Sequence, residues 1–192
     1  MTAAGWQAER FVMGAVYVAP GSERLADISQ CVVSLPRCFE WNVFHSAQME
    51  YACLDMDGVI CEDWTGFEGD EGESRRHYVH HLRNARPLFT PTSYRPLAIV
   101  TGRLERYRRE TEQWLARHNV RPMRLLMSQH DSAWDRRRAN DIVQQKANAY
   151  TAMPNARLFV ESDRGIATGI QERSGRPVLC TADMELIAPT AK

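Results

Sequence analysis

Short apolar runs alternate with stretches of helical periodicity from residue 51 onward. Each run is about five residues long and apolar enough for a strand that is covered on both faces of a sheet. The five predicted strands are Tyr51–Asp55, Leu97–Thr101, Met123–Met127, Arg157–Val160 and Pro177–Cys180. This alternation predicts an α/β fold with a parallel sheet, right-handed crossovers and flanking helices.

Three helices are predicted between these strands. The first follows Leu104, buries Trp114 and Leu115, and carries a supporting pair of Glu105 and Arg109 on its polar side. The expected helix ends are Asn119 after the first helix, a cap at Asp135 for a second helix that runs through Tyr150, and a cap at Ser162 for the third.

An acidic pair follows the first predicted strand. Asp55 and Asp57 are two residues apart, and Gly58 allows a sharp turn directly after them. Two carboxylates so close resist simultaneous ionisation unless a cation or a donor group compensates them. The spacing suggests a divalent metal or two carboxylates with separate roles, and a polar turn after a strand is the simpler alternative.

Polar residues also end the second and fourth predicted strands. They are Thr101, Gly102 and Arg103, and Glu161, Ser162 and Asp163. Ligands bind beyond the carboxyl ends of strands in an open parallel sheet, so these residues are expected to converge on the crevice at Asp55. Each alone is also compatible with a local role, as a strand-end hydroxyl or as an acid at a helix N-terminus.

Lys146 interrupts the apolar stripe of the second predicted helix, beside Val143 and Tyr150. A lysine in such a stripe often extends its ammonium group to the surface. A carboxylate cluster would instead compensate its charge, and the ammonium group would then hold an anionic substrate group.

Composition restricts the class of protein. The chain has 192 residues, 44% of them hydrophobic, with 24 basic and 24 acidic residues. One core with an appendage is expected, and the balanced charge gives no global attraction to nucleic acid or membrane. Five cysteines without CxxC spacing, and no signal-like or membrane-length apolar segment, lead us to expect a cytoplasmic protein with free thiols, no zinc and no membrane partner.

Four segments resemble, in order and spacing, the four motifs of the haloacid dehalogenase-like (HAD) superfamily of phosphotransferases. They are LDMDGVI, IVTGR, Lys146 within QQKANAY, and LFVESD, and the match spans residues 51–184. The resemblance implies a Rossmann-like, HAD-like fold and a phosphatase, a phosphoric monoester hydrolase that acts through an aspartyl-phosphate. It assigns Asp55 as the nucleophile and Asp57 as general acid and base, and the acid at position 57 favours hydrolysis over dehalogenation.

The resemblance also implies a Mg²⁺ cofactor, held by Asp55, the backbone carbonyl of Asp57 and an acid of the fourth motif. The commonest fourth motif has a glycine before the aspartate or two adjacent acids, whereas Ser162 separates the acids here. Either Asp163 or Glu161 is then the metal ligand, and we place Asp163 first because a shorter side chain at a helix start is held more rigidly. Thr101 and Lys146 complete the implied catalytic set, and the implied substrate-binding set is Thr101, Gly102, Arg103 and Lys146.

The HAD-like domain is expected over residues 49–188, with a small cap insert at about residues 62–95. The insert is too short for a large cap domain, so we expect an acidic, glycine-rich loop and one basic helix. Three histidines of that helix, His77, His80 and His81, are interpreted as a solvated or phosphate-facing surface rather than as a metal site.

Residues 1–48 resemble the closing part of a phosphoribosyltransferase domain that is fused to such phosphatase domains, through FVMGAVYV, QCVVSLP and CFEWNVFHS. The pyrophosphate-binding motif of the transferase is absent from the sequence, so transferase activity is not expected. This extension is expected to cover a sheet edge, to form a hairpin over the active site, or to mediate association with a second copy of the chain or with a phosphoribosyltransferase. The residues expected to form a dimer contact are Phe39, Trp41 and Phe44.

The expected substrate is a small phosphorylated molecule, a nucleotide or a sugar phosphate. The stretch TGRLERYRRETEQWLARHNV, with RPMRLLM and RRRANDIVQQK, more loosely resembles the 3′-phosphatase domain of polynucleotide kinase-phosphatases, in which arginines guide a nucleic-acid end. The alternatives are therefore a polynucleotide 3′-phosphatase that acts on a nucleic-acid 3′ end, and a non-catalytic regulatory domain associated with a phosphoribosyltransferase. A pseudo-enzyme would normally have lost at least one of the four motif residues. All four are present, which favours catalysis: Asp55, Asp57, Thr101 and Lys146.

Overall fold

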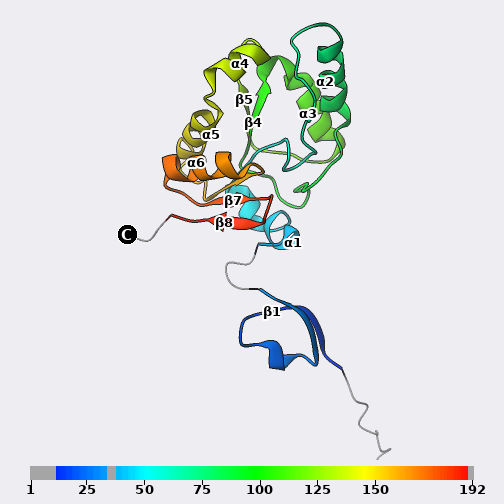
Figure 1. Ribbon diagram of the computed structural model, residues 1–192, viewed down its shortest axis with the longest axis vertical. Helices are drawn as coiled ribbons and strands as arrows, with labels where there is room; N and C mark the ends of the chain where they lie inside the picture. Colours follow the sequence, from blue (N-terminus) through cyan, green and yellow to red (C-terminus); the bar gives the residue numbers. More distant parts are fainter. Residues whose placement is uncertain (1–11, 34–37, 190–192) are drawn as a thin grey trace, which may run out of the picture. The chain divides into compact units, whose positions relative to one another are not determined.

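A computed structural model describes residues 12–33 and 38–189 of the chain. The chain divides into two compact units, residues 1–37 and residues 38–192. In the first unit, β1 (Gly14–Val18) and β2 (Ile28–Val32) pair in parallel and are connected through the 3-10 turn η1 (Glu23–Leu25) (Figure 1). Because the two strands are parallel, they do not form the hairpin that the sequence suggested.

The second unit is built on a six-stranded sheet with the order β5-β4-β3-β6-β7-β8. Its strands are β3 (Ala52–Leu54), β4 (Ala98–Leu104), β5 (Leu125–Ser128), β6 (Leu158–Glu161), β7 (Val178–Cys180) and β8 (Glu185–Ile187). All neighbours pair in parallel except β7 and β8. The five parallel strands confirm the predicted α/β fold, which is compatible with a Rossmann-like architecture, and the antiparallel edge strand β8 was not predicted.

Helices cover both faces of this sheet. They are α1 (Glu40–Val43), α2 (Gly72–Asn84), α3 (Arg108–Arg117), α4 (Ala133–Ala139), α5 (Ile142–Thr151) and α6 (Arg164–Ser174), with the 3-10 turns η2 (Ala47–Tyr51) and η3 (Glu105–Tyr107). Side chains of α1 and α3 pack on one face, and those of α5 and α6 pack on the other. None of the helices within residues 12–33 and 38–189 is both long and apolar enough to cross a membrane.

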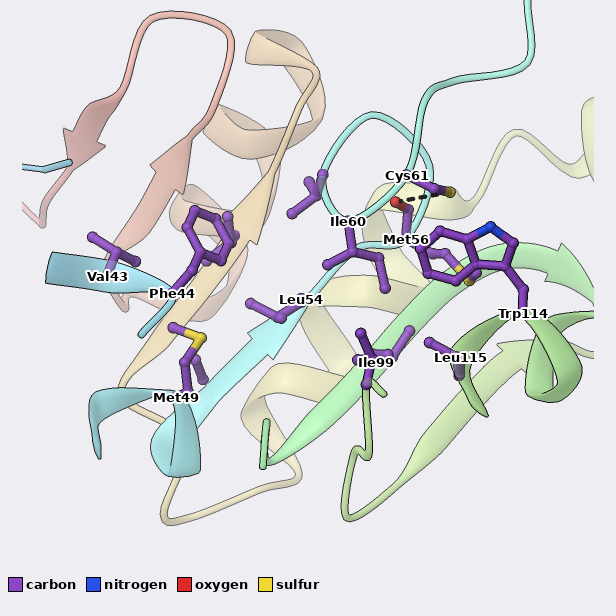
Figure 2. Close-up of a cluster of buried hydrophobic side chains, with 14 of the residues drawn as sticks. Val43, Phe44, Met49, Leu54, Met56, Ile60, Cys61, Ile99, Trp114 and Leu115 are labelled. Atoms are coloured by element: carbon purple, nitrogen blue, oxygen red, sulfur yellow. Dashed lines mark hydrogen bonds between the residues drawn. The ribbon is translucent and has the colours of Figure 1, made fainter. Parts of the chain in front are cut away.

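The two faces of the sheet follow from the alternation of side chains along each strand. Leu54 of β3 joins the cluster that contains Trp114 (Figure 2), whereas its neighbour Cys53 joins the opposite cluster with Tyr150. The indole Nε1 of Trp114 donates to the carbonyl of Ala85 over 2.8 Å, so the one polar atom of this buried ring is satisfied. Both layers of the core therefore lie against β3, which leads directly to the acidic pair.

The second predicted helix is two helices, α4 and α5. Asn140 adopts a left-handed conformation with φ 48° and ends α4, and α5 starts after Asp141. The cap predicted at Asp135 is wrong, because Ser132 Oγ accepts the backbone N–H of Asp135 over 3.0 Å. The break matters for the site because it sets the orientation of α4 independently of the helix that carries Lys146.

The first predicted helix begins as η3 and continues as α3. Asn119 follows its end in a left-handed conformation with φ 56°, as expected. Glu105 pairs with Arg108, at 2.9 Å between Oε2 and Nη2, rather than with Arg109. The pair is therefore three residues apart instead of four, because the tighter 3-10 turn brings side chains at that spacing onto one side.

Residues 38–48, which were assigned to the N-terminal extension, belong to the second compact unit. Val43, Phe44 and Met49 are buried in its core, and the ring of Phe44 stacks on Phe89 at 5.0 Å between centroids. Because Phe44 is fully buried, it does not present the dimer contact that was expected of it. The side chain of Trp41 lies outside the described part of the chain.

The five cysteines all lie among the described residues, and each is a free thiol, as predicted.

Candidate active site

A crevice of about 440 Å³ opens at the carboxyl ends of the central strands. The chain runs outward from β3 to β4 and β5, and then returns to β6 on the other side of β3, so the strand order reverses here. Asp55 follows β3, Gly102 lies near the end of β4, and Glu161 ends β6, and all three line the crevice. The topology therefore brings the predicted segments together at one edge of the sheet.

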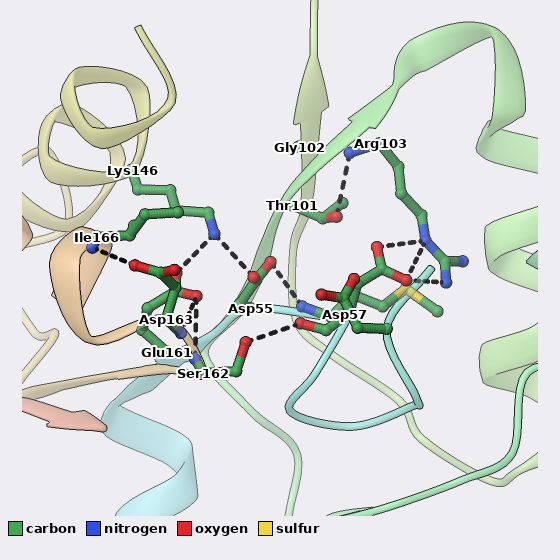
Figure 3. Close-up of polar contacts among 12 residues, drawn as sticks. Asp55, Asp57, Thr101, Gly102, Arg103, Lys146, Glu161, Ser162, Asp163 and Ile166 are labelled. Carbon is green, nitrogen blue, oxygen red and sulfur yellow. Dashed lines mark hydrogen bonds and ion pairs between the residues drawn. The ribbon is translucent and has the colours of Figure 1, made fainter. Parts of the chain in front are cut away.

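Lys146 lies between two of the acidic side chains. Its Nζ is 2.7 Å from Oδ2 of Asp55 and 2.6 Å from Oε2 of Glu161 (Figure 3). Only 3% of the Lys146 side chain is exposed, so its ammonium group does not extend to the surface. The ammonium group thus joins the ends of β3 and β6, which confirms that the lysine faces inward.

Two buried carboxyl groups, those of Asp55 and Glu161, share the single ammonium group of Lys146. Burial raises the pKa of Asp55 to about 8, with the Lys146 charge acting against this and the Glu161 charge adding to it. Asp55 is further held by the backbone N–H of Met56, which donates to Oδ1 over 2.7 Å. Near neutral pH this shift favours a proton on Asp55, because one ammonium group cannot compensate two buried carboxylates, and a cation bound beside Asp55 would take the place of that proton.

Asp57 is paired separately, with Arg103 (Figure 3). The guanidinium donates from Nε to Oδ2 over 2.8 Å and from Nη2 to Oδ1 over 2.5 Å, and Arg103 is 1% exposed. Burial alone would raise the pKa of Asp57, but the charge and hydrogen bonds of Arg103 outweigh it and lower the pKa. Arg103 therefore holds Asp57 as a carboxylate and does not line the crevice, where a substrate contact was predicted.

Gly58 allows the turn that follows the acidic pair. Its φ is +77°, and a Cβ atom at this position would lie 2.3 Å from Oγ of Ser162. Ser162 in turn donates from Oγ to the backbone carbonyl of Asp57 over 3.3 Å. The loops after β3 and β6 are therefore in close contact, which places the Asp57 carbonyl beside the fourth motif.

Glu161 and Asp163, at the end of β6 and the start of α6, have different partners. Oε1 of Glu161 accepts the backbone N–H groups of Ser162 and Asp163, at 2.9 and 3.2 Å, while Oε2 accepts Lys146. Asp163 accepts the N–H of Ile166 through Oδ1 over 2.8 Å and so caps α6, in place of the cap predicted at Ser162. Both oxygens of Glu161 are thus occupied by protein donors.

A divalent cation fits the chemistry of this oxygen set. Carboxylates of Asp55 and Asp163 and the Asp57 residue line one crevice, and such oxygens are the ligands that Mg²⁺ prefers. Across residues 12–33 and 38–189, no three His, Cys, Asp or Glu side chains are grouped as a complete metal site. A cation here would therefore need further oxygens, from a backbone carbonyl, water or substrate.

Thr101 and Gly102 lie at different depths. Thr101 is buried, and its Oγ1 accepts the backbone N–H of Arg103 over 3.2 Å, so the hydroxyl is used locally. Gly102 lines the crevice, and Thr101 is not part of that wall. The hydroxyl group of Thr101 thus stabilises the backbone near the end of β4. Its contact with a phosphate group stays a prediction.

Much of the crevice wall comes from residues outside the predicted site, although the two arginines among them belong to the RRRANDIVQQK stretch that was associated with a nucleic-acid substrate. These wall residues are Trp64, Glu68 and Tyr78 from the insert, and Arg136, Arg137 and Asn140 from α4 and its end. The insert contains a loop and the helix α2, as expected for these residues. Arg136 and Arg137 belong to the basic run RRRAND, which is visible in the sequence. Helical spacing alone does not show which side of a short helix faces a site.

Comparisons of the chain with protein-family models, curated proteins and solved structures find no match.

Proposed function

We propose that this chain is a Mg²⁺-dependent phosphohydrolase of the HAD type, which hydrolyses a phosphomonoester through an aspartyl-phosphate on Asp55. The observation that supports this proposal most directly is the position of the Lys146 ammonium group, which lies between the buried carboxyl groups of Asp55 and Glu161. A carboxylate attacks a phosphate dianion only if the repulsion between them is offset. A crevice with one ammonium group and room for a divalent cation offers that compensation.

The proposed cation ligands are Asp55, the backbone carbonyl of Asp57 and Asp163. Asp163 is preferred over Glu161 because Glu161 accepts hydrogen bonds from three protein groups, whereas Asp163 accepts the N–H of Ile166 and retains more acceptor capacity for a cation. When bound, Mg²⁺ would neutralise negative charge and polarise a phosphoryl oxygen.

In the first step, an oxygen of Asp55 forms a bond to phosphorus, and the bond between phosphorus and the leaving oxygen breaks. Asp57, in its protonated form, gives its proton to the leaving oxygen. In the second step, Asp57 takes a proton from water, and the water oxygen attacks phosphorus and releases the Asp55 carboxylate. Lys146 holds Asp55 in position and would share the charge of the transferring phosphoryl group.

The pair of Asp57 and Arg103 favours one half of this cycle. Because Arg103 lowers the pKa of Asp57, the base in the second step is stabilised and the acid in the first step is not. A leaving group that needs no proton, such as p-nitrophenolate, should therefore be released faster than an alkoxide.

The proposal is tested by the release of p-nitrophenol from p-nitrophenyl phosphate with and without Mg²⁺. Asp55→Asn should abolish turnover, and removal of the metal with a chelator should do the same. The matched control is Glu112→Gln, which makes the same carboxylate-to-amide change at an exposed site on α3 and should retain full activity. Undiminished turnover in Asp55→Asn refutes the proposed nucleophile and favours the non-catalytic regulatory alternative.

A nucleotide or sugar phosphate is the proposed substrate class, since the crevice volume is typical of small-molecule sites. A second candidate, a polynucleotide 3′-phosphatase, is favoured by a basic groove between α2 and α3. That groove is lined by Arg75, Arg76, His80, Arg83 and Arg106, among other residues. Relative turnover of nucleotide monophosphates, sugar phosphates and 3′-phosphorylated oligonucleotides separates the two candidates, and a salt-sensitive preference for oligonucleotides would support end repair.

Association with a phosphoribosyltransferase or with a second copy of the chain stays a proposal for the first unit. Val16, Ile28 and Val32 expose more than half of their surface on β1 and β2, which supports a role in association.

A further inference from the structure

Two arginines of α4 line the same crevice as the acidic residues. From their contacts we propose that Arg136 and Arg137 form a second anion site, which binds a second phosphate group of the substrate. This inference rests on the proposed function, because it assumes that the first phosphate lies at Asp55. It goes further by restricting the substrate to molecules that carry two phosphate groups.

Arg136 is fixed at the wall of the crevice by the chain that follows Thr101. Its Nη1 donates to the backbone carbonyl of Gly102 over 2.6 Å, so the guanidinium is anchored to the end of β4. Its Nη2 is paired with a carboxylate oxygen of Glu68, which comes from the insert. One edge of the guanidinium is thus positioned by the backbone and the other already binds an anion.

Arg137 approaches the same part of the insert. Its Nη1 donates to the backbone carbonyl of Glu68 over 3.0 Å, and its guanidinium lies over the ring of Phe67 at 5.1 Å. The two arginines therefore hold one loop of the insert, and both face the crevice.

The carboxylate of Glu68 occupies this site with one of its two oxygens unpaired in the described part of the chain. The Glu68 side chain is 7% exposed, and the oxygen without a hydrogen-bond partner among the described residues is Oε1. Burial raises the pKa of Glu68, although Arg136 and Arg137 oppose this effect. A phosphate group offers more acceptor oxygens to guanidinium groups than this carboxylate does, so it would compete well for the same donors.

The other cations near the crevice hold carboxyl groups of the proposed reaction site. Lys146 serves Asp55 and Glu161, and Arg103 is buried behind Asp57. Arg136 and Arg137 are therefore the cations of the described wall that a remote phosphate would meet. Such a group comes either from a small bisphosphate or from the phosphodiester next to a terminal phosphate in a polynucleotide.

The test is isothermal titration calorimetry with Mg²⁺ on the full chain carrying Asp55→Asn, which prevents turnover. Glucose 6-phosphate is compared with glucose 1,6-bisphosphate, and thymidine 3′-monophosphate with a dithymidine that has a terminal 3′-phosphate. In at least one pair, the ligand with the added phosphate should bind about tenfold more tightly. The pair that shows the gain identifies the source of the second phosphate.

The variants Arg136→Met and Arg137→Met should each remove most of that gain and leave the affinity of the monophosphate within about twofold. Arg138→Met is the matched control, since this arginine of the same helix lies over Trp134 and does not line the crevice. Glu68→Gln should strengthen binding of the ligand with two phosphates, because it removes the carboxylate that competes for Arg136. If an arginine variant does not fold, this variant takes its place, and unchanged or weaker binding of that ligand in Glu68→Gln would count against the second anion site.

Equal affinity within both ligand pairs, or an equal loss of the gain in Arg138→Met, would overturn the second anion site. The proposed function fails separately, if p-nitrophenyl phosphate is not hydrolysed by the unsubstituted chain while the affinity gain and its dependence on Arg136 are intact.

Discussion

Replacement of Lys146 by methionine tests the charge arrangement at the centre of the site. The side chains of Lys146, Asp55 and Glu161 are 3%, 9% and 1% exposed, so solvent screens their interaction very little. Removal of one partner from a buried ion pair typically costs about 3–5 kcal/mol, because the remaining charge is left buried. Here two carboxylates remain, and protonation of one limits the loss, so we expect a decrease of about 3 kcal/mol in the free energy of unfolding.

The assay is urea unfolding at neutral pH in the presence of a chelator, with the free energy obtained by linear extrapolation. Gln144→Met is the matched control on the exposed side of α5 and should change the stability by less than about 0.5 kcal/mol. Adding Glu161→Gln to Lys146→Met should recover part of the loss, since it removes a buried carboxylate that has lost its ammonium partner. If Lys146→Met is as stable as the unsubstituted chain, the ammonium group does not compensate these carboxyl groups.

Three further predictions concern the residues around this centre. Gly58→Ala should lower the free energy of unfolding by roughly 1–3 kcal/mol, and so lower the melting temperature, because the φ of residue 58 is +77° and the added Cβ would lie 2.3 Å from Ser162 Oγ. Arg103→Met should lower the free energy of urea unfolding by about 3 kcal/mol, because it leaves the Asp57 carboxylate without its partner, and Arg103→Lys should recover only part of this. Asp70→Asn should cost about 1 kcal/mol at pH 7, because the carboxylate accepts N–H groups of the first turn of α4, and urea unfolding across pH should show this difference shrinking below about pH 4.

The pH dependence of Asp70→Asn follows from the direction of its pKa shift. Burial alone would raise the pKa of Asp70, but the N–H groups of Ala133 and Trp134 and the guanidinium of Arg106 lower it. A lowered pKa in the folded state gives stability that is complete above the unfolded pKa and disappears as the pH falls through the folded pKa. A difference that grows toward acid pH would contradict this sign.

The other two predictions have equally direct counter-results. An unchanged melting temperature in Gly58→Ala would mean that the loop after β3 does not approach Ser162 as closely as described. Full stability in Arg103→Lys would mean that the paired hydrogen bonds to Asp57 contribute little.

Much of the fold follows from local pattern. The apolar runs that became β3 to β7 are long enough and apolar enough to be covered on both faces, and their parallel arrangement follows from the helices between them. Once the sheet is parallel, Asp55, Gly102 and Glu161 must meet at its carboxyl edge. The inward position of Lys146 follows from its place in an apolar stripe together with the carboxylates it would meet.

Other features depend on contacts that a linear pattern does not contain. The break at Asn140 is a left-handed residue inside a stretch of helical periodicity, and Asn is one of the few side chains that tolerates this conformation. Arg103 is buried because Asp57 lies across from it on another loop. The wall positions of Arg136 and Arg137 depend on where the insert folds back, through its contacts at Glu68.

The most direct test of the central claim is a crystal structure of the full chain with Mg²⁺ and beryllium fluoride, which mimics a phosphoryl group on a carboxylate. We expect beryllium bonded to an oxygen of Asp55, with Mg²⁺ held by Asp55, the Asp57 carbonyl and Asp163. An adduct on another residue, or no metal between Asp55 and Asp163, would contradict the proposed nucleophile and metal site.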